Sequence, residues 1–107
     1  MAARVAGIAV CADAVMKFEW DRRKAFSNFR EHRVSFQEAS TVFADPLARI
    51  HDDPDHSLGE QREMIVGHSS RGSLLLVSFT ERGDAVRIIS ARSTTPNERY
   101  DYEKGIL

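Results

Sequence analysis

LLLVSFTERGDAVRIISAR, residues 74–92, contains two strand-like runs joined by a short connection. In the first run Leu75, Val77 and Phe79 alternate with other side chains, which places them together on one face of a strand. The connection Arg82-Gly83-Asp84 is short and contains Gly, as hairpin connections do. We therefore expect two antiparallel strands whose core face carries these three apolar residues.

Two further strands are expected before this pair, and the turns between them are rich in Asp, Ser, Pro and Gly. Short turns of this kind favour an antiparallel meander of four strands. The alternating run Phe18-Glu19-Trp20 predicts an additional short strand at the start of the domain. The expected strands of the meander are Leu47–His51, Arg62–His68, Leu74–Glu81 and Ala85–Arg92.

A first helix is expected after the short strand, with Asp21 as its N-cap. Ala25, Phe26 and Phe29 repeat at helical spacing, and Asn28 is expected to turn away from them. This pattern predicts an amphipathic helix whose two Phe side chains face the core.

Two more helices have clear start signals. Ser35 and Glu38 form a capping-box pattern for the second helix, which should stop before Asp45-Pro46 because Pro disfavours helical geometry in the preceding residue. Thr95-Pro96-Asn97-Glu98 starts the last helix, which should end at Gly105. The whole pattern predicts an α+β domain of two layers, with both N-terminal helices on one sheet face and a site on the partly open face.

The chain has 107 residues, the size of one domain. We expect residues 16–107 to form this domain and residues 1–15 to be a poorly ordered extension, because Met16 directly precedes the first strand-like segment. The single cysteine, Cys11, cannot form an internal disulfide, and no run approaches the roughly 20 apolar residues that span a bilayer. These features predict a cytoplasmic protein without a membrane partner.

The formal net charge of −1 excludes a general nucleic-acid coat, because non-specific phosphate binding depends on a surplus of cations. Any contact with RNA must therefore be local. From Arg62 to Arg99 the basic residues outnumber the acidic ones, whereas the preceding segment is acidic.

Four stretches at these spacings carry a resemblance to a known family. They are Phe18-Glu19-Trp20-Asp21 with Lys24; Val34-Ser35-Phe36, Glu38-Ala39, Val42-Phe43 and Asp45-Pro46; Asp53, Asp55-His56-Ser57, Glu60, Arg62 and Gly67; and Arg87-Ile88-Ile89-Ser90-Ala91-Arg92 with Glu98-Arg99. The chain is similar in these stretches to the BrnT toxins of type II toxin–antitoxin systems, over roughly residues 16–104.

The resemblance implies a RelE-like fold and a ribonuclease, without a cofactor, that halts translation. It also implies a BrnA-type antitoxin with a ribbon-helix-helix DNA-binding part as partner, for which we expect a 2:2 complex that contacts DNA only through the antitoxin. One position departs from the family pattern, because Arg33 stands where many members have Gly. A non-Gly residue in a left-handed helix cap costs on the order of 1 kcal/mol, which the fold should tolerate.

RNA cleavage without a metal needs cations on the phosphate, and arginine suits this role because its planar fork binds two phosphate oxygens and stays charged. Arg62, Arg87 and Arg92 are candidates for catalysis because they lie on expected strands. Arg87 and Arg92 are five positions apart and should point to opposite faces unless a bulge or a strand end intervenes. Arg92 could equally bridge the sheet to the last helix through Glu98.

Glu60 and His56 complete the expected catalytic set, as groups able to transfer a proton. Each has an alternative role, Glu60 as the ion-pair partner of Arg62 and His56 as a turn residue. Asp53, Asp55 and His56 match no established spacing for metal ligands, and Asx-turn hydrogen bonds account for an Asp-rich turn. No metal site is therefore expected.

Three further residues are expected to contact RNA. Lys24 lies in the first turn of a helix, where a cation is mildly unfavourable, and this invites a functional explanation. His32 ends the same helix, and interaction with the helix dipole is its alternative role. Tyr100 on the last helix could stack on a base or simply pack against the sheet.

Two other classes of function stay open at this stage. A non-catalytic domain that acts by complex formation and by regulating its own operon is possible, because no obligatory acid–base pair is present. A metal-dependent nuclease or hydrolase would need convergent carboxylates, whereas the acidic residues are dispersed in turns.

Overall fold

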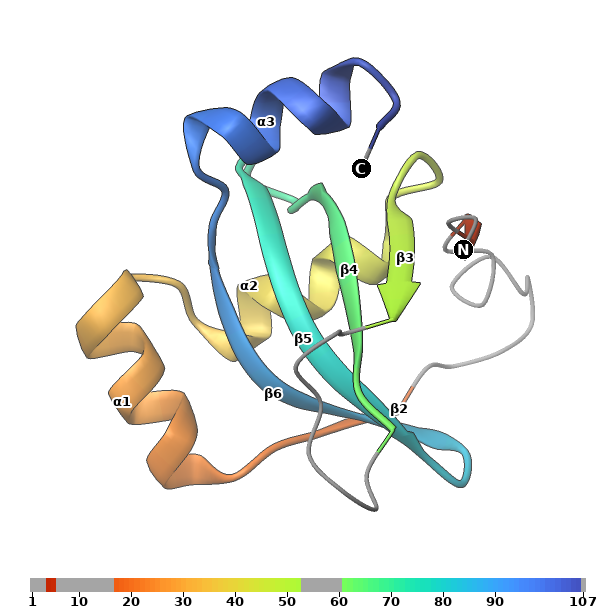
Figure 1. Ribbon diagram of the computed structural model, residues 1–107. Helices are drawn as coiled ribbons and strands as arrows, with labels where there is room; N and C mark the ends of the chain where they lie inside the picture. Colours follow the sequence, from red (N-terminus) through yellow and green to blue (C-terminus); the bar gives the residue numbers. More distant parts are fainter. Residues whose placement is uncertain (1–3, 6–16, 53–60, 107) are drawn as a thin grey trace.

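The computed structural model describes residues 4–5, 17–52 and 61–106 of the chain. The strands and helices are β1 Arg4–Val5, β2 Lys17–Glu19, α1 Arg22–His32, α2 Phe36–Thr41, β3 Arg49–Asp52, β4 Glu63–His68, β5 Leu74–Arg82, β6 Ala85–Ser93 and α3 Pro96–Glu103 (Figure 1). A 3-10 turn, Val42–Ala44, continues α2. The expected order of elements is confirmed from β2 to α3. The expectation of a poorly ordered extension falls mostly outside the described residues.

The described strands form one sheet in the order β1-β3-β4-β5-β6-β2. Strands β3 to β6 make the expected antiparallel meander. The short strand β2 does not continue this pattern, because it pairs parallel with β6, from Lys17 opposite Ala85 to Glu19 opposite Arg87. Parallel neighbours need a long crossover, and the helices that follow β2 supply it. The sheet is therefore mixed, and the expectation of a purely antiparallel sheet is wrong at this edge.

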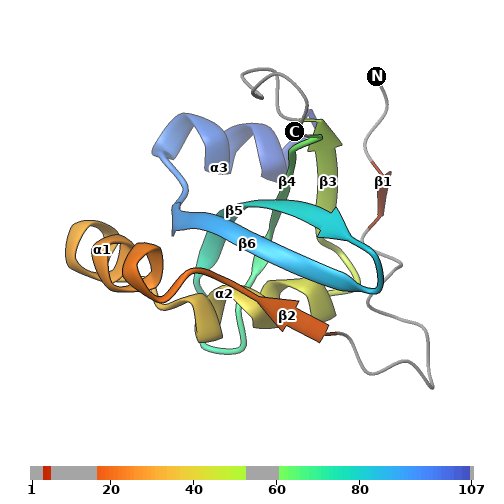
Figure 2. The same cartoon turned by 90° about the horizontal axis from the view of Figure 1, so that it is seen from below.

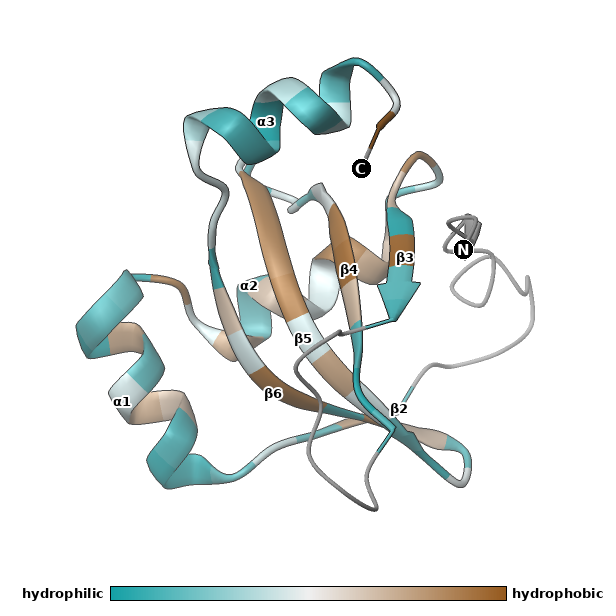
Figure 3. Cartoon of the chain, viewed as in Figure 1, coloured by the Kyte–Doolittle hydropathy of each residue, from teal (hydrophilic) through white to brown (hydrophobic). Residues whose placement is uncertain are grey.

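The main core lies between α2 and one face of the sheet, which we call the α2 face. Leu75, Val77 and Phe79 of β5 are fully buried there, as the sequence pattern predicts. Phe36 and Phe43, from α2 and the turn after it, are buried against them. Figure 3 shows the hydrophobic residues concentrated along the central strands.

The opposite face of the sheet, which we call the α3 face, is covered at one end by α3. A smaller cluster of Val66, Leu74 and Leu76 is buried there, with Met64 and Tyr102 packed against it. Figure 2 shows α2 and α3 on opposite sides of the sheet. The molecule therefore has a third layer at this end, which the expected arrangement of two layers lacks.

Helix α1 is oriented differently from the prediction. Asn28 is buried, whereas Phe26 and Phe29 are 65% and 46% exposed. The Asn28 amide donates to the carbonyl oxygens of Val34 and Ala91, at 3.0 and 2.8 Å, and its oxygen accepts from the Ala91 N–H at 3.1 Å. Because β2 pairs only with the start of β6, Ala91 lies on a strand edge that needs hydrogen-bond partners. The amide thus decides which face of α1 turns inward.

The helix ends follow the sequence signals. Arg33 caps α1 in the left-handed region at φ 61°, the conformation that favours Gly. Thr95 and Glu98 form the predicted capping box of α3, and Gly105 follows this helix at φ 79°. Within the described part of the chain, no helix is long and apolar enough to cross a membrane.

Candidate active site

A β-bulge places Arg87 and Arg92 on the same side of the sheet. Ser78 pairs with Ser90, whereas the next residue of β5, Phe79, pairs with Ile88, so β6 carries one extra residue at this point. The extra residue reverses the alternation of side chains, so that positions five apart share a face. Both arginines therefore lie on the α3 face, opposite Thr80 and Leu76 of β5. These partners are four positions apart on β5, about 13 Å of strand.

Other polar side chains share this face beyond the part that α3 covers. His51 of β3 lies opposite Met64, which packs on the α3 face, so His51 lies on this face too. Arg62 directly precedes β4, and extending the alternation of β4 by one residue assigns it to the same face. The Thr80 hydroxyl, beside Arg87, donates to the carbonyl oxygen of Gln61 at 2.7 Å. We call Arg62, Arg87, His51, Ser78 and Thr80 the polar half of the α3 face.

Arg87 is held by an acidic neighbour on the parallel edge strand. Its guanidinium donates to the carboxylate of Glu19 at 3.0 Å, and the Arg87 side chain keeps 31% exposure. Arg82 lies near the same carboxylate at 3.9 Å. The pairing of β2 with β6 thus fixes the position of Arg87 but leaves part of its guanidinium accessible to a ligand.

Arg92 donates more hydrogen bonds within the described part of the protein than Arg87 does. Its two terminal nitrogens donate to the two carboxylate oxygens of Glu98, at 2.8 and 2.9 Å, and one of them also contacts the carbonyl oxygen of Ser93. The hydrogen bonds from Arg92 lower the pKa of Glu98 to about 2. This is the bridge from the sheet to the last helix that the sequence leaves open as an alternative, and the Arg92 side chain keeps 37% exposure.

His51 is a candidate that the sequence analysis does not single out. Its Nε2 is buried and has no hydrogen-bond partner among the residues that the structure describes, although the residue as a whole is half-buried. A buried nitrogen without a partner is costly and calls for an explanation. The sequence signal that could have identified His51 is the alternation Arg49-Ile50-His51. Ile50 is buried in the core, so the neighbouring His51 lies on the opposite face of the sheet.

Comparison of the chain with known proteins agrees with this fold. The family model described as "Ribonuclease toxin, BrnT, of type II toxin-antitoxin system" matches residues 20–98, more than half of the chain. The chain belongs to the BrnT family. The crystal structure of the Brucella abortus ribonuclease toxin BrnT matches at a TM-score of 0.56 and 24% identity, over 76% of this chain and 99% of that one. At this identity the structural match supports the fold. None of the curated proteins compared with the chain matches it.

The remaining candidate residues that the sequence analysis names are placed as follows. Glu60 and His56 lie outside the described residues. Lys24 is exposed on α1, and His32 at the end of α1 lies 3.8 Å from Glu31. Tyr100 is exposed on α3 beneath the ammonium group of Lys104. These three do not join the polar half of the α3 face.

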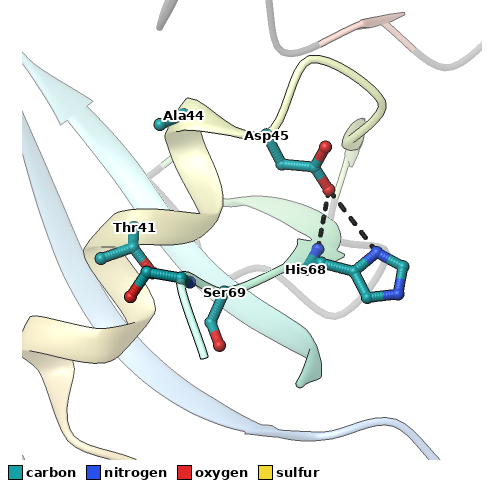
Figure 4. Close-up of a pocket in the computed structure, with 6 residues that line it drawn as sticks. Thr41, Ala44, Asp45, His68 and Ser69 are labelled. Atoms are coloured by element: carbon teal, nitrogen blue, oxygen red, sulfur yellow. Dashed lines mark hydrogen bonds and ion pairs between the residues drawn. The ribbon is translucent and has the colours of Figure 1, made fainter. Parts of the chain in front are cut away.

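A pocket of about 500 Å³ opens beside the turn that follows β4 (Figure 4). Asp45 accepts hydrogen bonds there from the N–H groups of His68 and Leu47, at 2.8 and 2.9 Å, and the His68 Nδ1 is 3.7 Å away. The Ser69 hydroxyl donates to the carboxylate of Glu38 at 2.7 Å, so it is not directed at His68. These bonds tie the β4–β5 turn to α2, and we assign this pocket a structural role in the BrnT domain.

In the described ranges, no group of three or more His, Cys, Asp or Glu side chains lies close enough to hold a metal ion. The side chains named in the polar half of the α3 face are two arginines, two hydroxyls and one imidazole.

Proposed function

We propose that this BrnT-family protein is a metal-independent endoribonuclease that cleaves RNA on the polar half of the α3 face and thereby inhibits translation. The observation that carries the proposal is the bulge in β6, because it brings Arg87 to the same face as His51, the face to which Arg62 is also assigned. Two cations and a group that can transfer a proton are thus available on one surface.

The proposed reaction uses the RNA's own nucleophile. The 2′-oxygen bonds to the adjacent phosphorus, the bond from phosphorus to the 5′-oxygen breaks, and the products carry a 2′,3′-cyclic phosphate and a 5′-hydroxyl. His51 accepts the proton of the 2′-hydroxyl, and the leaving 5′-oxygen takes a proton from solvent. Because His51 is half-buried, rotation of its ring can present Nε2 to the substrate.

Arg87 and Arg62 have the electrostatic role in this proposal. A guanidinium stabilises the charge that builds up on the phosphate oxygens, and preorganised charges of this kind contribute several orders of magnitude to rate in enzymes. Glu19 acts as a positioning residue, since it holds the Arg87 guanidinium at 3.0 Å. Arg92 belongs to the ion pair with Glu98 and is not assigned to the reaction.

The proposed setting follows from the family. A toxin of a type II system has an antitoxin, and we propose a BrnA-type protein with a ribbon-helix-helix part, in a 2:2 complex in the cytoplasm that contacts DNA only through the antitoxin. The support is the family match over residues 20–98.

The experiment is cleavage of a labelled RNA by the purified protein in excess EDTA, with the product ends identified chemically. We expect cyclic phosphate ends, and we expect Arg87→Ala to lower kcat/KM by about 10²-fold to 10³-fold. His51→Gln should lower it by a similar factor, because Gln cannot accept the proton of the 2′-hydroxyl. The matched control is Arg71→Ala, because Arg71 is an exposed arginine in the β4–β5 turn.

Two results would overturn the proposal. Cleavage that EDTA abolishes and Mg²⁺ restores would place the protein among metal-dependent nucleases. A folded protein that cleaves neither free nor ribosome-bound RNA, and does not arrest growth on expression, would instead favour the non-catalytic interaction domain.

A further inference from the structure

Helix α1 carries a stripe of cations and exposed aromatic rings that contributes nothing to the core. Arg22, Phe26, Phe29 and Arg30 lie at positions i, i+4, i+7 and i+8, which fall on one side of a helix, and the guanidinium of the capping residue Arg33 lies over the Phe29 ring on the same side. We call these five residues the α1 stripe. The inward side of the helix is formed by Ala25 and Asn28, so the stripe faces away from the sheet.

Each ring of the stripe lies beside a guanidinium. The Arg30 carbon Cζ is 5.8 Å from the centroid of Phe26, and that of Arg33 is 5.9 Å from the centroid of Phe29. These distances are typical of cation–π contacts. The rings are nonetheless 65% and 46% exposed, which is unusual for Phe on a protein of this size.

The charge of this helix differs in sign from that of the whole protein. Between Asp21 and Arg33 there are five Arg or Lys residues and two acidic ones, whereas the chain has a formal net charge of −1. The stripe itself contains no acidic residue. Its charge therefore fits an anionic partner, and its rings fit a partner with flat apolar faces.

Single-stranded RNA has both properties. Its phosphates pair with guanidinium groups, and its unstacked bases stack on aromatic side chains, which is how many proteins hold single strands. A double helix keeps its bases stacked and would leave the rings without a partner. In the stripe each ring has a guanidinium beside it, so one strand can place a base on a ring and a phosphate against the neighbouring cation.

The position of α1 connects the stripe with the sheet. Asn28 bonds to both backbone groups of Ala91, which neighbours Arg92 on the strand that also carries Arg87. We propose that the α1 stripe binds single-stranded RNA beside the sheet, holding a substrate whose scissile phosphate lies on the α3 face. This deepens the proposed function and rests on it only for the identity of the RNA as substrate.

The test measures the affinity of the whole chain for a fluorescent 2′-O-methyl RNA, which lacks the attacking hydroxyl and cannot be cleaved by the proposed reaction. We expect Phe26→Ala and Phe29→Ala each to raise Kd about tenfold, the order of one lost stacking contact. Leu47→Ala is the matched control, since Leu47 is an apolar side chain outside α1 with 74% exposure. Far-ultraviolet circular dichroism and thermal unfolding verify that each variant is folded.

A second measurement separates stacking from charge. We expect Arg22→Gln combined with Arg30→Gln to reduce the slope of log Kd against log salt concentration by about 1.4, the value for two lost phosphate contacts on a single strand. Arg71→Gln, which changes an exposed arginine outside α1, should leave the slope unchanged.

Unchanged RNA affinity in both Phe variants would overturn the inference. A stripe that binds a protein partner instead of RNA would give this result. Failure of the proposed function gives a different result, because the wild-type protein would then bind this RNA in a stripe-dependent way without cleaving a normal one.

Discussion

At the scale of single residues, Glu98 joins two structural roles. Its carboxylate accepts hydrogen bonds from both terminal nitrogens of Arg92. It also accepts one from the N–H of Thr95 at 2.8 Å, which closes the capping box of α3. These contacts, with Arg92 as the main cause, lower the pKa of Glu98 from 4.5 to about 2. The ionised form is thus stabilised in the folded protein, so the contribution to stability is present above pH 4.5 and is lost as the pH falls toward 2.

We predict that Glu98→Gln lowers the free energy of unfolding by about 1–2 kcal/mol at pH 7, an estimate that allows for solvent screening of the partly exposed Arg92. Gln keeps the capping box, so the change isolates the charge. The difference from wild type should shrink in urea unfolding as the pH is lowered from 5 to 3. Glu103→Gln is the control, since Glu103 is an exposed helix residue. A difference that is constant over this pH range would contradict the assignment.

At the scale of elements, α1 is attached to the sheet mainly through a polar residue. Asn28 is its only fully buried residue, and the three bonds of its amide satisfy backbone groups of β6 and of the segment after α1. The apolar side chains that would normally bury such a helix are exposed.

We predict that Asn28→Ala lowers the free energy of unfolding by about 2–4 kcal/mol, because it leaves buried backbone groups without partners. Amide hydrogen exchange should show the largest loss of protection in α1 and at Ala91, with β4 and β5 less affected. Ser27→Ala, at an exposed neighbouring position, should have little effect on either measurement. Equal loss of protection throughout the sheet would show that α1 is not a separately attached element.

Sequence patterns predicted most helices and strands, but they predicted wrongly which face of α1 turns inward and how β2 pairs at the edge of the sheet. The alternation in β5 predicted its core face because apolar burial decides which side of a central strand turns inward. Helix α1 lies on a strand edge, where an unpaired backbone N–H and carbonyl matter more than apolar surface, so the rule that predicted buried Phe side chains selected the wrong face.

The candidate site could be predicted only in part. Arg62 and Arg87 were proposed from their residue type and their expected strand positions, but the bulge that puts Arg87 and Arg92 on one face leaves no mark in the sequence. A bulge depends on how two strands pair, and pairing is a property of the assembled sheet. His51 was missed for a related reason, because its significance comes from a buried nitrogen without a partner.

At the scale of the whole molecule, the two faces of the sheet differ in how strongly they hold the fold together. The α2 face joins the start, middle and end of the domain: the ring of Phe43 lies 5.3 Å from that of Phe18 on β2 and 5.0 Å from that of Phe79 on β5. The α3 face has a smaller cluster, and Tyr102 adds one hydrogen bond to the carbonyl oxygen of Leu47 at 3.1 Å. The polar half beside it contributes ligand-binding groups in place of apolar packing.

This asymmetry predicts two different responses to truncation of a core aromatic residue. Phe43→Ala should lower the free energy of unfolding by about 3–5 kcal/mol, a large part of the 5–15 kcal/mol typical of a domain, because it opens a cavity among three elements. Tyr102→Ala should cost less, about 1–3 kcal/mol, since Tyr102 is only half-buried. Hydrogen exchange should then show α3 opening separately in Tyr102→Ala and the whole sheet losing protection in Phe43→Ala. The reverse order of these costs would mean that the α3 side, and with it the support of the polar half, is the structural centre of the molecule.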